Sequence, residues 1–106
     1  MTDTAKRFSG PTLLTASAAD QYTVPASTTA IIRNIHVAEG NGSATSLTLS
    51  IGTDALAKRL FSAVSIPANN ILDLPCFIVL SGGEKIQAFA SATNSLVLTV
   101  SGVEVS

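Results

Sequence analysis

The segment TAIIRNIHVAEGNGSATSLTLSIG, residues 29–52, decides the fold class of this chain. Apolar and polar residues alternate along its first part, with Ile31, Ile35 and Val37 expected on one face together with Arg33. Residues 46–52 alternate in the same way, and a period of two is typical of a β-strand with one buried face. The loop between them, EGNGSA, is rich in residues that accept positive φ angles. The segment therefore predicts two strands joined as a β-hairpin.

The rest of the chain repeats this arrangement of short strands between turns. Pro67 and Pro75 are expected at strand ends, where a missing N–H does least harm, and Gly82 and Gly83 in a hairpin turn. Short strands separated by regular turn signals indicate a sandwich or barrel. We predict an all-β, antiparallel β-sandwich, jelly-roll-like, with about eight to nine short strands. The turn signals are SGP at 9–11, VPAS at 24–27, IPANN at 66–70, SGG at 81–83 and ATN at 92–94.

One segment also fits a helix. In TDALAKRLFSAV, residues 53–64, Leu56, Leu60 and Val64 recur every four residues, which is a helical spacing. The Ile66-Pro67 pair and the β-branched residues before it favour a strand instead, and a strand is our prediction for the end of this segment.

The C-terminal strand changes phase at Gly102. Leu96, Leu98 and Val100 alternate with polar or smaller residues, but the next apolar residues are Val103 and Val105. A β-bulge at Gly102 would return all five to the core, because a bulge inserts one extra residue into a strand. The alternative is a strand that is buried on both faces.

Length and charge indicate one neutral domain. The chain has 106 residues, enough for a single core, and we treat residues 1–106 as one β-sandwich domain in which residues 1–10 form an extended N-terminal arm. Hydrophobic residues make up 46%, charged residues only 12% against a usual share of about 25%, and the formal net charge is −1. Such a surface has no basic patch for nucleic acid.

The single cysteine and the apolar runs bear on the compartment. Cys76 lies in the apolar stretch LPCFIVL and has no partner for an intrachain disulfide, which suits folding in a reducing cytoplasm. We expect Cys76 to be buried among Leu74, Phe77 and Val79 and therefore unreactive towards thiol reagents. No run has the length of a signal peptide or a membrane span, so no membrane partner is expected.

No group of residues predicts catalysis, a cofactor or a metal. His36 is the only histidine and lies in a predicted strand beside Asn34, where a surface or interface role is expected. One histidine and one cysteine forty positions apart do not make a zinc site. The SGG and GNG sequences lack the lysine and helix of a phosphate loop. We therefore expect no enzyme activity, no cofactor and no bound metal.

The outward positions of the best strands carry Thr, Ser, Asn and Ala, which lose little side-chain entropy when a neighbour covers them. Sheet edges are usually protected by Lys, Glu or Pro, and few of these occur here. We expect much of the exterior to be covered in the working state, with a homo-oligomer, and a two-fold dimer in particular, as the simplest arrangement.

Two stretches carry a family resemblance. They are YTVPASTTAIIRNIHVAEGNGSATSLTLSIG, residues 22–52, and VSIPANNILDLPCFIVLSGGEKIQAFASATNSLVLTVSGVEV, residues 64–105. Their pattern of YTVP, RNIHV, IPAN, GGEKIQA and SGVEV resembles the small virion structural proteins of tailed bacteriophages. Within that group, size and predicted fold are most similar to capsid cement or decoration proteins.

The resemblance implies a virion protein that is made in the host cytoplasm and binds the major capsid protein or other virion subunits. Neck, tail and fibre-associated proteins share the same style of sequence, and a host-receptor or glycan-binding module is a further alternative. Stacking platforms for sugars normally use Trp or Tyr, and the chain has no Trp and a single Tyr, Tyr22.

Overall fold

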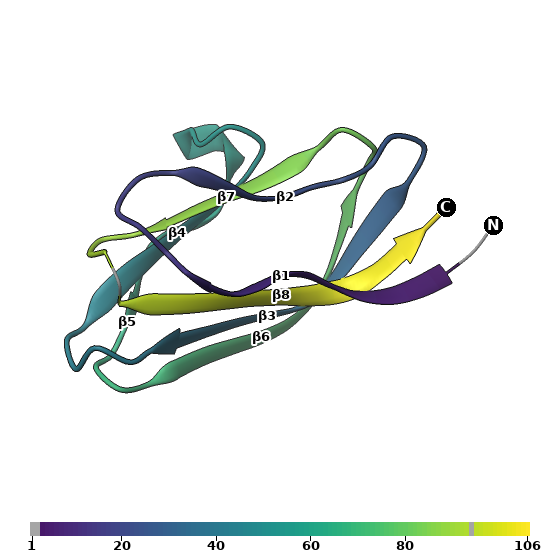
Figure 1. The fold of residues 1–106 in the computed structure, drawn as a ribbon. Coiled ribbons are helices and arrows are strands. Elements are labelled where there is room, and N and C mark those ends of the chain that lie inside the picture. Colours follow the sequence, from purple (N-terminus) through teal and green to yellow (C-terminus); the bar gives the residue numbers. More distant parts are fainter. Residues whose placement is uncertain (1–2, 94) are drawn as a thin grey trace.

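The computed structural model describes residues 3–93 and 95–106, and these residues form eight strands and one short 3-10 helix (Figure 1). The 3-10 helix η1 (Leu56–Lys58) is a single turn, and β5 begins at Arg59, so the end of the 53–64 segment is a strand as predicted. The strands are β1 (Asp3–Leu13), β2 (Ala19–Thr23), β3 (Thr29–Glu39), β4 (Thr45–Ile51), β5 (Arg59–Ile66), β6 (Ile71–Leu80), β7 (Lys85–Ala90) and β8 (Leu96–Val105).

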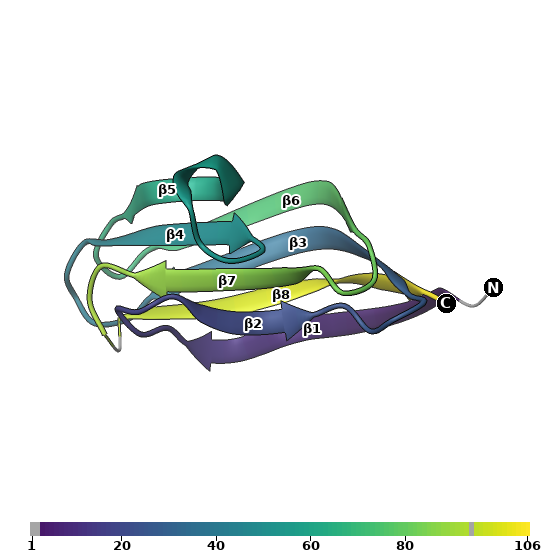
Figure 2. The ribbon, with the colours of Figure 1, turned by 90° about the horizontal axis from the view of Figure 1, so that it is seen from above.

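The strands form two antiparallel four-stranded sheets that face each other (Figures 1 and 2). The first sheet has the order β1-β8-β3-β6 and the second has the order β2-β7-β4-β5. Neighbours in each sheet are mostly distant in sequence, which is the interleaved double Greek key of a jelly roll. The prediction of an all-β antiparallel sandwich is confirmed.

The predicted hairpin over residues 29–52 is wrong. β3 pairs with β6 and β8 in the first sheet, whereas β4 pairs with β5 and β7 in the second. The loop at residues 40–44 therefore crosses from one sheet to the other. Alternation predicted both strands, but it carries no information about which strand lies beside them.

The core lies between the two sheets, and aliphatic side chains dominate it. From the first sheet come Ile32, Ile35 and Val37 of β3, each completely buried. Because the register of β3 shifts between Ile32 and Asn34, Ile32 rather than Ile31 joins Ile35 and Val37 inside, so the face predicted for Ile31 is wrong. The other buried hydrophobic residues are Phe8, Leu14, Val24, Ala30, Leu47, Leu49, Ile66, Leu80, Ile86, Ala88, Ala90, Leu96, Leu98 and Val100.

The predicted bulge at Gly102 is also wrong. Gly102 pairs with Lys6 of β1 and Ile32 of β3, and the register shifts leave the extra residues in those neighbouring strands, at Phe8 and Arg33. β8 itself alternates without interruption, so Val103 and Val105 take the outer face. The inner positions beyond Val100 are Gly102 and Glu104, and the Phe8 ring occupies the space that a side chain at Gly102 would need.

Pro75 lies within β6, and not at a strand end as predicted. It pairs with Asn34, and the adjacent register shift places Cys76 and Phe77 opposite Arg33 alone. β6 is an edge strand of the first sheet, where a residue without an N–H is tolerated, particularly at a bulge. The two apolar pieces on either side of Pro75 are therefore one strand.

Glu39, at the end of β3, is almost fully buried and hydrogen-bonds to the backbone of two loops. Its carboxylate accepts hydrogen bonds from the backbone N–H groups of Asn41 and Gly42, both at 3.0 Å, and of Asn69, also at 3.0 Å. These hydrogen bonds, led by the one from Asn69, hold the pKa of Glu39 below its ordinary value.

Pro67 lies where predicted, directly after β5, and its carbonyl accepts the Asn70 N–H at 3.2 Å.

Gly82 and Gly83 lie in a turn, as predicted for the SGG sequence, but the predicted hairpin is wrong, because this turn connects β6 of the first sheet to β7 of the second. This turn packs against the loop that follows β2: the Gly83 N–H donates to the Val24 carbonyl at 2.9 Å. A Cβ at Gly82 would lie 3.1 Å from the Pro25 carbonyl oxygen. Residues 3–10, which were expected as an extended arm, are the first part of β1 and pair with β8; residues 1–2 lie outside the described residues.

Candidate interaction surface

The most distinctive surface of the molecule is the outer face of the first sheet, defined as the side chains of β1, β8, β3 and β6 that point away from the core. On β6 these side chains alternate with the buried or half-buried residues of the same strand. Three of them are large and apolar: Phe77 is 66% exposed, Ile71 59% and Val79 53%. Phe77 and Val79 are successive outward residues of β6, and exposed apolar residues that lie together mark interaction surfaces more often than isolated ones do.

One apolar row crosses the outer face at the end where β3 finishes. Ala38 of β3 pairs with Ile71 of β6 on one side and with Val97 of β8 on the other, and Val97 pairs with Leu13 of β1. Leu13 is 50% exposed. We call these four residues the Ile71 row.

A second apolar row crosses the same face at the opposite end. Ile31 of β3 pairs with Val79 of β6 and with Val103 of β8, and Val103 pairs with Ala5 of β1. We call these four residues the Val79 row. Each row therefore takes one apolar side chain from every strand of the sheet.

Polar residues fill the middle of the outer face. The Asp73 carboxylate accepts a hydrogen bond from the Asn34 amide at 2.9 Å and lies 3.3 Å from Nδ1 of His36. The Asn34 hydrogen bond, followed by the contact with His36, lowers the pKa of Asp73. Near the Val79 row, the Arg33 guanidinium lies 5.7 Å from the centre of the Phe77 ring, a cation–π contact.

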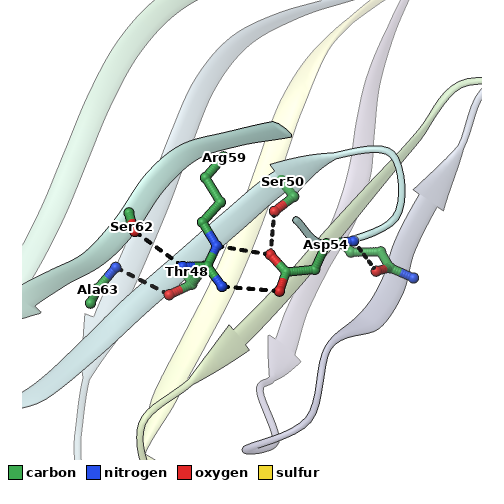
Figure 3. Close-up of polar contacts among 7 residues, drawn as sticks. Thr48, Ser50, Asp54, Arg59, Ser62 and Ala63 are labelled. Atoms are coloured by element: carbon green, nitrogen blue, oxygen red, sulfur yellow. Dashed lines mark hydrogen bonds and ion pairs between the residues drawn. The ribbon is translucent and has the colours of Figure 1, made fainter. Parts of the chain in front are cut away.

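The outer face of the second sheet instead carries a network of hydrogen bonds and ion pairs (Figure 3). The Asp54 carboxylate accepts hydrogen bonds from Ser50 Oγ at 2.6 Å and from Arg59 Nε and Nη2 at 3.1 and 3.2 Å. The Arg59 hydrogen bond is the main cause of the lowered pKa of Asp54. The Asp54 N–H donates to Gln87, whose amide donates to Asp20. These polar groups are paired with one another, so the role of this network is to stabilise the loop after β4.

Two further exposed leucines lie on η1 and on the edge strand β5. Leu56 is 77% exposed and Leu60 is 41% exposed. They belong to the second sheet and its connection, so they are separate from the outer face of the first sheet. We call this pair the Leu56/Leu60 site.

A third polar cluster closes the space between the sheets near the chain ends. Glu104 of β8 accepts hydrogen bonds from the Tyr22 hydroxyl and from Lys6 Nζ, the latter at 3.1 Å. Tyr22 stacks on Phe8 with ring centres 4.7 Å apart. Burial, then the bond to Glu104, raises the pKa of Tyr22, and that bond lowers the pKa of Glu104. The cluster links β2 to the first sheet and is satisfied internally.

The structure places the sequence-predicted residues in separate structural positions and brings none of them together as a site. Gly82, Gly83 and Pro67 lie in turns, Pro75 in the β6 edge and Gly102 against Phe8. Cys76 is half-buried and its Sγ lies 3.7 Å from the Ile32 carbonyl. Its predicted neighbours Phe77 and Val79 lie on the opposite, exposed face of β6, so that part of the prediction is wrong.

Over residues 3–93 and 95–106, no pocket is found and no three His, Cys, Asp or Glu side chains are grouped as metal ligands would be. The same part of the chain has no helix that is long and apolar enough to cross a membrane.

The sequence alone did not predict the two apolar rows, because each row is assembled from four strands that are distant in the chain. The alternation within β6 was the available signal. No protein-family model, curated protein or solved structure matches this chain.

Proposed function

We propose that this chain is a non-enzymatic structural protein of a tailed-bacteriophage virion, a cement or decoration protein that binds and stabilises the shell of major capsid subunits. The observation that carries the proposal is the presence of two separate exposed apolar surfaces on one small jelly roll. These are the outer face of the first sheet and the Leu56/Leu60 site. A protein that links neighbours needs at least two such contacts.

Composition and resemblance support the same function. A chain with 12% charged residues has an exterior that costs little to cover, and apolar contacts persist when salt screens charges. The YTVP to SGVEV pattern resembles virion structural proteins, in which a protein made in the host cytoplasm is incorporated into the particle. The cement role is the more specific part of the proposal.

The abundance of the chain in purified virions tests the cement role. Quantitative protein staining should give an amount comparable with that of the major shell protein. A few copies per particle would contradict the cement role and favour a neck, tail or fibre position. Absence from particles would overturn the virion proposal and leave a receptor-binding or glycan-binding module as the alternative to examine.

A binding experiment tests the Leu56/Leu60 site. Purified chain added to particles that lack it should sediment with them, at low salt and at about 1 M salt, where the Debye length is about 3 Å. The Leu56→Asp/Leu60→Asp variant should no longer sediment, because burying a carboxylate against an apolar neighbour is unfavourable. Ser65→Asp is the matched control, since Ser65 is also exposed on β5. Equal loss of binding in the control would contradict the assignment of this site.

A further inference from the structure

We infer that the outer face of the first sheet binds a second copy of this chain, in a two-fold dimer whose axis lies along the face and crosses the strands midway between the Ile71 row and the Val79 row, close to the level of Pro75. This inference rests on the proposed function in that it names the neighbour that covers one of the two apolar surfaces. The Leu56/Leu60 site then remains free for the shell.

The apolar pattern on the outer face of the first sheet is self-complementary under this two-fold rotation. Turning one copy by 180° about an axis across the strands exchanges the two ends of every strand. The Ile71 row of one copy then lies on the Val79 row of the other, so that apolar side chains from all four strands meet apolar side chains. A two-fold interface repeats each contact, and both ends of the face are therefore covered.

Charge follows the same symmetry along β6. The rotation brings Ile71 of one copy onto Val79 of the other. Asp73 lies on the Ile71 side of the axis, and Phe77 and Arg33 lie on the Val79 side. Asp73 of one copy therefore comes close to the Arg33 guanidinium of the other, which lies over the Phe77 ring. The face carries two acidic and two basic side chains, Asp3, Asp73, Arg7 and Arg33, so two copies do not repel each other by net charge.

The size of the face is that of a stable interface. The four strands have 11, 10, 11 and 10 residues. At about 3.3 Å per residue and about 4.8 Å between strands, they cover roughly 600 Å² in projection, and side chains enlarge the accessible area. A standard interface buries about 800 Å² on each partner.

The exposed edge of β6 is a poorer contact than the face. Pro75 offers no N–H to an added strand, and the bulge next to it bends the edge. Face-to-face packing needs no backbone hydrogen bonds and brings the two apolar rows together, as in the aligned packing of sheets within a sandwich.

Analytical ultracentrifugation of the purified chain tests the inference. The wild type should sediment as a dimer at micromolar concentration. Val79→Arg and Ile71→Arg should each raise the dissociation constant by at least about tenfold, while circular dichroism and the melting temperature stay close to those of the wild type. Ser65→Arg, on the edge of the second sheet, is the matched control and should remain a dimer.

A charge-exchange pair tests the geometry of the axis. Asp73→Arg should weaken the dimer, because the introduced guanidinium would face Arg33 of the other copy, and Arg33→Asp should weaken it because two carboxylates would meet. An equimolar mixture of the two variants should form heterodimers, since every contact is then between opposite charges. A mixture that stays monomeric while Val79→Arg also disrupts the wild-type dimer would overturn this axis.

A wild-type chain that is monomeric at about 100 μM, or a dimer unaffected by Val79→Arg and Ile71→Arg, would overturn the inference as a whole, because a micromolar complex would be dimeric at that concentration. These outcomes leave the abundance in virions unaffected. Failure of the dimer and failure of the cement role are therefore separate results.

Discussion

At Gly102 three strands come so close that no side chain fits. A Cβ there would overlap the Ile31 carbonyl oxygen and lie 2.9 Å from the Phe8 ring. The ring could shift, but the carbonyl belongs to the sheet. Gly102→Ala should therefore lower the free energy of unfolding by about 2 kcal/mol or more, through overpacking against the backbone.

Gly40 is the control for this substitution, because no atom lies within 4 Å of the Cβ position there. Gly40→Ala should change the free energy of unfolding by less than about 0.5 kcal/mol. Urea unfolding with a constant m-value measures both variants. Equal effects of the two substitutions would show that close packing at Gly102 is not what matters.

Glu39 gives a pH-dependent prediction at the same scale. Its folded pKa lies below the ordinary value of 4.5 because backbone N–H groups, that of Asn69 first, bind the ionised carboxylate. A lowered folded pKa adds stability that is present above the unfolded pKa and lost as the pH falls through the folded value. The wild type should therefore be more stable than Glu39→Gln near about pH 7, with the difference shrinking as the pH falls below 4.5.

Urea unfolding of both proteins at several pH values measures that difference. Other carboxylates also lose stabilising contacts in acid, and the comparison between two variants at each pH cancels their shared contribution. A difference that stays constant down to about pH 3 would contradict the assigned role of Glu39.

Within β6 the alternation of faces makes a prediction for Cys76. The thiol is half-buried on the inner side, and burial raises its pKa, with a smaller opposing effect of Arg33. The thiolate is the reactive form, so thiol reagents should label the folded protein much more slowly than the protein in urea. In a Cys76→Ser background, Ser65→Cys on exposed β5 should react rapidly. Similar rates for Cys76 and the introduced cysteine would contradict the inward position.

At the scale of elements, the sequence predicts where the strands lie but not which strands pair with one another. Alternation in 29–39 and 46–52 correctly indicated β3 and β4, yet the two strands lie in different sheets. The apolar residues of β8 move to the other face after Val100 although the strand itself has no bulge. The extra residues lie in β1 and β3, which the sequence of β8 cannot reveal. The apolar rows depend on both strand order and register, so the candidate surface could not be predicted from any single segment.

For the whole molecule, the jelly-roll order predicts slow folding. β1 pairs with β8 across almost the whole chain, with Thr4 opposite Glu104. Loop closure over such distances must precede the contacts that stabilise it, so refolding should take milliseconds to seconds and not microseconds. Stopped-flow fluorescence of Tyr22 after dilution from urea measures the rate. Complete refolding within tens of microseconds would contradict the dominance of long-range pairing.

The pairing of β1 with β8 also fixes where the two ends of the described chain emerge. Asp3 lies opposite Val105, and Figure 1 shows the N and C labels at the same pole of the sandwich. A peptide fused genetically to either end would therefore be displayed from that pole. The fused peptide would not cover the crossing loop at residues 40–44. A circular permutant that joins the two ends with a short linker and opens at this loop keeps every strand pairing intact.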